Sequence, residues 1–375
     1  MKKFCLSFIL VVLFCVTAGA QQSGQKRNAL YGVGFYNLEN LFDTIHDAGK
    51  NDYEFLPGGS YHWNSMKYNS KLQHMAKVLS QLCTDKLPNV GASVIGVSEV
   101  ENARCMSDLV AQKPLADRGY KYVHVDGPDR RGVDCAFLYN PRFFTLQDYY
   151  LVPFYYKDAA QPDVDLGFTV GADNKVTPYP IHPMRGDTAY ITRGFLVMTG
   201  LLSGEKIHFI VCHLPSRAAA SPARERGGEQ LYALKNALLK QDPGSKVIIM
   251  GDMNDDPKNK SMNDALACKH KKEDVKEAAD MYNPWWDVLY KVGQGTLLYD
   301  GKWNLFDQIL LSGDFIGNDR SSLKLYTNRI FLKDYLIQQE GKYKGSPLRT
   351  HASGVWLNGY SDHLPTEIYL IKELQ

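Results

Sequence analysis

Residues 247–254 read Val-Ile-Ile-Met-Gly-Asp-Met-Asn, and this stretch decides the fold. A short apolar run of this kind predicts a buried strand. Gly251 permits a close backbone approach where the strand ends, and Asp252 and Asn254, two residues apart, face one side in extended backbone. The alternative is a turn rich in Asp and Asn or a calcium loop, but the later Gly and closing Glu of a helix–loop–helix calcium loop are absent. The stretch therefore predicts a buried strand with a polar site at its C-terminal end.

Other apolar runs extend this pattern along the chain. With the strand at 246–250, the predicted strands are 31–36, 93–97, 133–139, 195–201, 207–212, 305–311 and 367–371. Apolar residues at helical spacing predict helices at about 68–82 and 226–239. Strands that alternate with helices indicate an α/β protein. Prolines among aromatic residues predict irregular loops over 148–192, and a loop-like insertion is expected over 258–286.

The first 20 residues are typical of a secretory signal peptide. Two lysines precede an apolar run at 4–16, and small residues at 18–20 suit cleavage near Ala20. The apolar run is shorter than the roughly 20 residues that span a bilayer, and Phe14 before Cys15 disfavours a lipid anchor. We therefore expect a secreted or periplasmic protein with no transmembrane segment in the mature chain. A flexible lead-in is expected at 21–29, followed by one domain at 30–375.

Charge and cysteine content exclude several classes of protein. The chain has 43 Lys and Arg against 41 Asp and Glu, and removal of residues 1–20 takes away two lysines and no acid. The mature chain is thus formally neutral, which argues against binding nucleic acid through a broad positive surface. Five cysteines remain, without the spacing of a zinc site, so at most one disulfide is expected. Nothing in the composition predicts an obligate protein partner.

Nearly every predicted strand ends in carboxylate, amide or imidazole side chains. Sites are assembled at this edge in layered α/β folds. Any one of these strand ends has an ordinary explanation, such as a capped turn or a solvated carboxylate, but packing does not explain six in one chain. The residues are Asn37 with Glu39, Glu99, His213 with Ser216 and Arg217, Asp252 with Asn254, Asp307, and Asp362 with His363.

We expect opposite surroundings for two acidic residues in these stretches. Asp307 lies within an apolar run, where an unpaired carboxylate is unfavourable, so we expect it to have a partner, most naturally a histidine. Glu101, two residues beyond Glu99, is expected at the surface.

The order of the motifs resembles the endonuclease/exonuclease/phosphatase superfamily, which includes deoxyribonuclease I. Asn-x-Glu at 37–39 is followed by Ser-Glu-Val at 98–100, Arg-Arg-Gly-Val-Asp-Cys-Ala-Phe-Leu-Tyr at 130–139 and His-Leu-Pro-Ser-Arg at 213–217. Gly-Asp-Met-Asn-Asp at 251–255, Phe-Asp-Gln-Ile at 306–309 and Ser-Asp-His at 361–363 complete the set. The resemblance runs from about residue 31 to 370. It implies a four-layer α/β sandwich of two packed mixed β-sheets flanked by helices.

The resemblance also implies a metal centre and a group of catalytic residues. Glu99 resembles the family's principal metal ligand, with Asn37, Glu39 and Asp362 around the same ion. Such oxygen ligands suit Mg²⁺, or Mn²⁺, better than zinc. The implied catalytic residues are Asp252 for the attacking water, Asn254, His213 and His363 for phosphate oxygens, and Asp307 behind His363.

The basic residues are predicted to contact substrate or to form surface ion pairs. The substrate-binding candidates are Arg131, Ser216 and Arg217. Arg130, Arg193, Arg224 and Arg226 are equally compatible with surface salt bridges.

The implied activity is hydrolysis of a phosphodiester by activated water, with a nuclease acting on DNA or RNA as the first expectation. One alternative is a phosphatase or a sphingomyelinase-like enzyme acting on inositol phosphates or lipids, for which the aromatic residues of 149–183 would line a pocket or touch a membrane. The other is a non-catalytic binding protein on the same fold, which the complete set of acidic and histidine residues disfavours.

Overall fold

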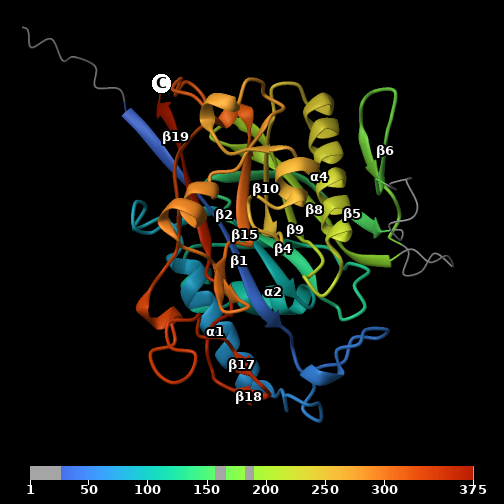
Figure 1. Ribbon diagram of the computed structural model, residues 1–375, viewed down its shortest axis with the longest axis vertical. Helices are drawn as coiled ribbons and strands as arrows, with labels where there is room; N and C mark the ends of the chain where they lie inside the picture. Colours follow the sequence, from blue (N-terminus) through green and yellow to red (C-terminus); the bar gives the residue numbers. More distant parts are fainter. Residues whose placement is uncertain (1–26, 157–165, 182–189, 375) are drawn as a thin grey trace, which may run out of the picture.

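The computed structural model describes residues 27–156, 166–181 and 190–374. In these residues two large β-sheets pack against each other and helices cover their outer faces (Figure 1). The four-layer α/β sandwich predicted from the sequence is therefore confirmed. No helix in the described ranges combines the length and the apolar character needed to cross a bilayer. The predicted signal peptide at 1–20 lies outside the described residues.

The first sheet has six strands and the second has seven. The first is built from β1 (Arg27–Leu41), β2 (Ala92–Val100), β3 (Lys121–His124), β4 (Asp134–Tyr139), β16 (Lys324–Ile330) and β19 (Thr366–Leu374). The second is built from β5 (Phe144–Tyr156), β8 (Tyr190–Leu202), β9 (Glu205–His213), β10 (Lys246–Asp252), β11 (Cys268–Lys269), β12 (Met281–Tyr282) and β15 (Asp307–Ser312). The strand orders are β16-β19-β1-β2-β4-β3 and β11-β12-β15-β10-β9-β8-β5.

Three two-stranded hairpins and several helices complete the described chain. The hairpins are β6 (Phe168–Val170) with β7 (Val176–Pro178), β13 (Leu297–Tyr299) with β14 (Lys302–Asn304), and β17 (His351–Ala352) with β18 (Val355–Trp356). The α-helices are α1 (Ser65–Gln81), α2 (Ala103–Val110), α3 (Lys113–Ala116) and α4 (Ser221–Gln241). Short 3-10 or π-helices are Tyr53–Phe55, Ser261–Ala265, Lys272–Asp274, Val288–Val292, Gly313–Phe315 and Asp334–Leu336.

Each large sheet mixes parallel and antiparallel pairs of neighbouring strands, and the short β11 and β12 at one edge of the second sheet are also parallel. β1 runs parallel to β2 in the first sheet, and β9 runs parallel to β10 in the second. All four strands carry predicted site residues at or near their carboxyl ends, where His213 pairs in register with Asp252. The topology therefore presents polar side chains from both sheets at strand ends.

Alternation along β1 shows why the sheets stack. Val33 and Phe35 belong to the core between the sheets, whereas Tyr36 and Leu38 belong to the core beneath α1. The sheets approach closely at Gly96, where an added Cβ would lie 2.4 Å from Met250 Sδ. The helices α1 and α4 lie on opposite sides of the strands (Figure 1).

All eight predicted strands and both predicted helices are present, most of them longer than predicted. The prediction of irregular loops over 148–192 is wrong at both ends, because β5 and β8 form a long antiparallel pair there. Phe154 is one of the aromatic residues expected to line a pocket or touch a membrane. It lies instead in β5 and is 2% exposed. The predicted flexible lead-in is wrong for residues 27–29, which already belong to β1. The insertion at 258–286 holds only short elements, as expected.

Candidate active site

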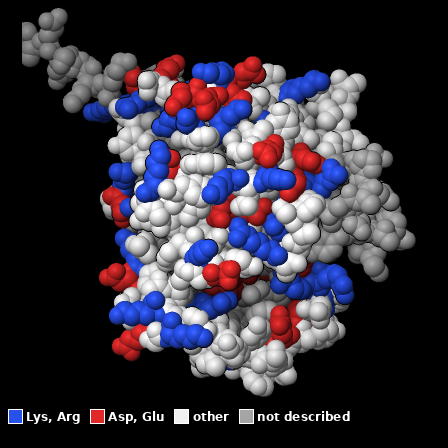
Figure 2. Space-filling model, in the orientation of Figure 1, with Lys and Arg blue, Asp and Glu red and all other residues white. Residues whose placement is uncertain are grey.

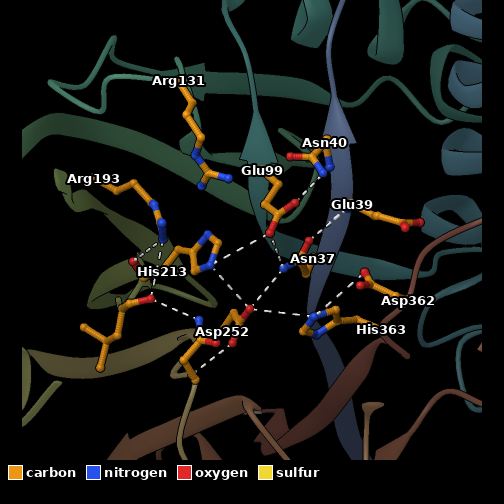
Figure 3. A network of polar contacts seen from close by, with 12 residues as sticks. Asn37, Glu39, Asn40, Glu99, Arg131, Arg193, His213, Asp252, Asp362 and His363 are labelled. Atoms are coloured by element: carbon orange, nitrogen blue, oxygen red, sulfur yellow. Dashed lines mark hydrogen bonds and ion pairs between the residues drawn. The ribbon is translucent and has the colours of Figure 1, made fainter. Parts of the chain in front are cut away.

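Predicted site residues from both sheets converge on the carboxylate of Asp252 (Figure 3). Asn37 Nδ2 donates a hydrogen bond to Asp252 Oδ2 at 3.0 Å, although the two residues come from different sheets. His213 Nε2 lies 3.5 Å from the same oxygen, and His363 Nε2 lies 3.8 Å from it. Four side chains that are up to 326 positions apart in the chain (37 to 363) thus meet at one oxygen.

Three of the segments that reach the site use the same local turn. Asn37 Oδ1 accepts a hydrogen bond from the backbone N–H of Glu39, and Asp252 Oδ1 accepts one from that of Asn254, both at 2.9 Å. Ser361 Oγ accepts one from the backbone N–H of His363 at 3.1 Å. Asn, Asp and Ser favour such bonds to backbone two residues on. The spacing of the motifs is thus the spacing of these turns.

Glu99 reaches the site because β2 is irregular at this residue. Glu99 has a φ of +63°, and the pairing of β2 with β4 shifts register between Ser98 and Val100. A bulge of this kind redirects a side chain out of the strand alternation. The Glu99 carboxylate accepts hydrogen bonds from Asn37 Nδ2 at 3.1 Å and from the backbone N–H of Asn40 at 3.0 Å.

The two histidines beside Asp252 have opposite surroundings. His363 Nδ1 lies 2.7 Å from Asp307 Oδ2, the partner predicted for that buried acid. Burial lowers the pKa of His363, but Asp307 and Asp252 raise it, and it ends well above its ordinary value. Burial, with Arg193 and Arg131 nearby, places the pKa of His213 well below its ordinary value.

The pKa of Asp252 itself is raised to about 7. Burial is the main cause, and the nearby carboxylates of Asp307 and Glu99 add to it, whereas His363 opposes the shift. A carboxyl group with such a pKa holds and releases a proton near neutral pH, as a general base does. Perturbed groups of this kind concentrate at functional sites.

The predicted metal ligands are divided between two places. Asn37 lies with Glu99, but Glu39 lies apart from them, unlike the ligand set around one ion that the resemblance implies. Positive φ values of +47° at Glu39 and +58° at Asn40 break the strand alternation. The Glu39 carboxylate instead accepts hydrogen bonds from Arg349 Nε at 3.1 Å and from the backbone N–H of Thr350 at 2.6 Å.

Arg349 joins Glu39 to Asp362. Its second amino group donates to Asp362 Oδ2 at 2.8 Å, while Asp362 Oδ1 lies 3.9 Å from His363 Nε2. Figure 3 shows Glu39 and Asp362 on the opposite side of Asn37 from Glu99. A guanidinium between two carboxylates offsets their mutual repulsion.

Lys71 lies behind this group. Its ammonium donates to Thr350 Oγ1 and to the carbonyl oxygen of Tyr360, both at 2.6 Å. Burial lowers the pKa of Lys71 to about 8, and burial together with Asp362 raises that of Glu39 to about 7.

The predicted substrate-binding residues differ in availability. Arg131 is half exposed and extends toward His213, with Asp129 3.8 Å away (Figure 3). Ser216 is exposed. Arg217 is held within the protein, because it donates to the carbonyl oxygen of Asn254 at 3.2 Å and pairs with Asp256 at 3.2 Å.

The other arginines form ion pairs in the described chain. Arg193 is 7% exposed and pairs with Asp129 at 3.4 Å. Arg224 is buried against Asp255, and Arg226 pairs with Glu229 on the surface of α4. Arg130 is exposed, and Arg131 combines exposure with a direction toward the site.

The expectation that Glu101 is a surface residue is wrong. Glu101 is 3% exposed, accepts a hydrogen bond from the backbone N–H of Asp43 at 2.7 Å, and has a pKa raised to about 8, chiefly by burial. The five cysteines outside the predicted signal peptide are buried free thiols.

Sequence reasoning missed Arg349 and Lys71. Arg349 lies in a loop without any periodic pattern and meets a partner 310 positions away, so no local signal marks it. Lys71 had a signal, because it follows Tyr68 by three positions and precedes Met75 by four, on the apolar stripe of α1. A lysine on such a stripe indicates a buried charge with a partner.

The donor atoms of the site fit a divalent cation. Glu99, His213 and Asp252 each place one possible ligand atom within 4.8 Å of the other two. The carboxylates of Glu99 and Asp252 both accept from the Asn37 amide, so two negative groups face one small volume. Mg²⁺ is typically bound by one or two carboxylates with water completing its shell. The residues present therefore suit Mg²⁺ or Mn²⁺.

The chain is similar to known proteins in sequence and in fold. The sequence matches the Endonuclease/Exonuclease/phosphatase family over residues 32–165 and 178–372. No curated protein matches the chain. The fold is similar to that of a family protein from Bacteroides thetaiotaomicron, with 16% identity, a TM-score of 0.53, and coverage of 93% of this chain and 97% of the other.

Two further solved structures share the fold. A mannosyl-6-phosphatase from Bacteroides thetaiotaomicron has 15% identity and a TM-score of 0.51, with 91% of this chain and 99% of the other covered. D. rerio TDP2, complexed with a single-strand DNA product, has 13% identity and a TM-score of 0.50, with the same coverage. The family match over most of the chain decides the assignment: the protein belongs to the endonuclease/exonuclease/phosphatase family.

Proposed function

We propose that this protein is a metal-dependent hydrolase of phosphodiester bonds that acts on DNA or RNA. The convergence of Asn37, His213 and His363 on one oxygen of Asp252 carries the proposal. It gathers a base, hydrogen-bond donors and a cation site in one place, as hydrolysis of a phosphodiester requires.

Each residue has a chemical task in this proposal. Asp252, with a pKa of about 7, accepts a proton from the attacking water. His363, kept protonated by Asp307 and Asp252, donates to a phosphate oxygen, and so does His213. Asn254 Nδ2 donates one N–H to the carbonyl oxygen of Leu214 at 3.0 Å. In this proposal its second N–H donates to a phosphate oxygen.

Glu99, with Asn37 beside it, would hold Mg²⁺ or Mn²⁺. The bound ion supplies positive charge to the phosphate oxygens as negative charge develops on them. Glu39 and Asp362, which both bind Arg349, would adjust the charge beside the metal ion.

Two further proposals concern the protein's location and its preferred substrate. The signal-like residues 1–20 support export with cleavage near Ala20. An exported enzyme of this type fits the degradation of external nucleic acid. Among the solved structures of this fold, one is a complex with single-strand DNA product and one is a mannosyl-6-phosphatase, so the test must include both kinds of substrate.

The experiment is a substrate panel with Mg²⁺, Mn²⁺, Ca²⁺ or chelator. The panel holds plasmid DNA, single-stranded RNA, bis-p-nitrophenyl phosphate, inositol phosphates, mannose 6-phosphate and sphingomyelin. We expect metal-dependent hydrolysis of the nucleic acids and the diester. Asp252→Asn should lower the rate by at least about 10²–10³-fold, a typical loss for one transition-state group.

The control is Asp117→Asn, which removes one carboxylate from an exposed surface pair with Lys113. It should retain the wild-type rate. Hydrolysis by Asp252→Asn at the wild-type rate would refute the assignment of the base. No metal-dependent hydrolysis of any substrate would favour a non-catalytic binding protein.

A further inference from the structure

A pocket of about 400 Å³ opens beside the candidate active site. Arg349 and Asp362 both line it. Because Asp362 Oδ1 lies 3.9 Å from His363 Nε2, the pocket and the site share a residue. A substrate bound at Asp252 and His363 can therefore extend into this pocket.

Two of the pocket's walls are tight hairpin turns. The β13–β14 hairpin turns at Asp300 and Gly301, with φ values of +51° and +71°, and contributes Leu298 and Gly301 to the lining. The β17–β18 hairpin turns at Ser353 and Gly354, with φ values of +49° and +79°. Two positive φ values in a two-residue loop are typical of the type I′ turn, a well-ordered hairpin connection.

The third wall is a closed loop that presents two lysines. Its ends are joined by hydrogen bonds from Gln338 N to Ser346 O at 2.8 Å and from Gly345 N to Gln338 O at 2.9 Å. Lys342 and Lys344 line the pocket from the tip of this loop and are exposed. The backbone bonds hold the tip in place, so the lysines have a defined position beside the pocket.

The pocket's lining is positively charged. Lys342, Lys344 and Arg349 face a single acid, Asp362, which already accepts a hydrogen bond from Arg349. Within the described ranges neither lysine forms an ion pair. In Figure 2, Lys and Arg side chains gather at the lower left of the molecule, over the orange-red segment that precedes β17 in Figure 1.

Part of the remaining lining is apolar or aromatic, and part is polar. Leu298, Leu357 and the Tyr343 ring lie among the cations, and Tyr343 is 49% exposed. Ammonium groups bind phosphate as point charges, and an exposed ring offers a surface for a base or sugar. The pocket therefore combines recognition of an anion with recognition of a flat or apolar group.

We propose that this pocket binds a second phosphate of the substrate, adjacent to the phosphate that is cleaved. The proposal rests on the proposed function and names what the substrate carries beside the scissile bond. The second phosphate is either the next one along a nucleic-acid strand or a neighbouring one on a polyphosphorylated small molecule. It also gives a formally neutral mature chain a local means of holding a polyanion.

The test compares substrates that differ by one phosphate. One set is the dinucleotide TpT against pTpT and TpTp. The other is an inositol monophosphate against an inositol bisphosphate. For wild type, kcat/KM should be higher for the member with the extra phosphate in the set that matches the natural source. In the variant Lys342→Ala/Lys344→Ala this preference should fall by roughly 5- to 30-fold, the effect expected for loss of two exposed charge contacts.

The double variant should leave the rate on bis-p-nitrophenyl phosphate unchanged, because that substrate has a single phosphate. For an oligothymidylate substrate, the slope of log kcat/KM against log salt should become shallower by about 0.7, the value for one phosphate that is no longer neutralised on a single strand. The matched control is Lys271→Ala/Lys276→Ala, which removes two exposed lysines that do not line this pocket. It should retain the wild-type preference.

Failure of the pocket proposal and failure of the proposed function give different results. If bis-p-nitrophenyl phosphate is hydrolysed but the double variant keeps the full preference, the pocket proposal is overturned and the proposed function stands. If no substrate is hydrolysed, the proposed function fails. The pocket is then tested by fluorescence anisotropy with labelled pTpT, whose equal binding to wild type and the double variant would overturn the pocket proposal as well.

Discussion

At the scale of single residues, the site places two histidines with opposite pKa shifts beside the same carboxylate. His363 and His213 both lie within 4 Å of Asp252 Oδ2. Asp307 stands behind His363, whereas Arg193 is hydrogen-bonded at the carbonyl oxygen of His213. An anion favours the imidazolium and a cation disfavours it. The protein therefore holds one imidazole charged and the other neutral beside a single base.

Asp307→Asn tests this separation. The substitution removes the negative charge that raises the pKa of His363, so the imidazolium should be lost at a lower pH. The alkaline limb of the profile of kcat against pH should therefore move to lower pH, and kcat at pH 8 should fall by about 10- to 100-fold, less than the roughly 10²–10⁴-fold contribution of a complete general acid–base group.

The comparison is the same profile for Asp314→Asn, which removes a carboxylate from the 3-10 helix Gly313–Phe315 that follows β15. Its profile should match wild type. An unchanged alkaline limb in Asp307→Asn would mean that Asp307 does not control the proton on His363.

At the scale of elements, the ends of β1 and β10 are built alike. Each has, at or near its carboxyl end, an Asn or Asp whose side-chain oxygen caps a backbone N–H two residues on, and the capped residue has a left-handed φ, +47° at Glu39 and +51° at Asn254. Non-glycine residues with positive φ are uncommon and cluster at functional sites. The same local device therefore ends a strand of each sheet at the active site.

Gly251 is needed where β10 passes β9. A Cβ at Gly251 would lie 2.2 Å from the carbonyl oxygen of Cys212, a backbone atom that cannot move aside. Gly251→Ala should lower the free energy of unfolding by about 1–3 kcal/mol, the usual penalty of overpacking. It should also lower kcat, because Asp252 follows directly. Urea unfolding and initial rates measure the two effects.

Gly58→Ala is the matched control for stability. A Cβ there meets no atom within 4 Å and the residue's φ is not in the left-handed range. Its free energy of unfolding should equal that of wild type or rise by about 0.4–1 kcal/mol through a smaller entropy of the unfolded chain. Equal stability of the two alanine variants would contradict the tight approach at Gly251.

The sequence predicts the central strands better than their ends. Runs such as 246–250 are buried on both faces, so an unbroken apolar run marks them. The direction of Glu99 depends on a register shift between Ser98 and Val100, which leaves no trace in the residue types. The motifs predicted which residues gather, but not that Glu39 would turn to Arg349. That contact joins a strand end to a loop 310 positions later.

At the scale of the whole molecule, the site bridges the two sheets. Asn37 and Glu99 come from the first sheet, and His213 and Asp252 come from the second. The packing of one sheet on the other, close at Gly96 and Met250, therefore sets the distance between the proposed cation site and the proposed base. An ion bound between Glu99 of the first sheet and Asp252 of the second would contact both sheets and stabilise their association.

Binding of Mg²⁺ should therefore raise the melting temperature. A ligand at 100 times its Kd stabilises the folded state by about 2.7 kcal/mol, which corresponds to a rise of roughly 4 °C for a domain of this size. EDTA should reverse the rise. Differential scanning calorimetry with and without Mg²⁺ measures it independently of any substrate.

Glu99→Gln removes a carboxylate of the proposed cation site and should abolish the rise. Asp117→Asn, on an exposed helix end far from β2 in the chain, should show the full rise. An equal rise in Glu99→Gln and wild type would place the stabilising ion elsewhere.

The position of β19 has a consequence for synthesis of the protein. β19 pairs with β1 and β16 inside the first sheet, and Ser361, just before it, donates a hydrogen bond to the carbonyl oxygen of Asn37 at 2.8 Å. The strand that pairs with one edge of β1 is thus synthesised nearly 330 residues later. A chain still attached to a ribosome holds residues 37 to 252 of the site but not His363, so it has no complete site. The candidate site is therefore complete only after synthesis has passed His363 and β19 can pair with β1.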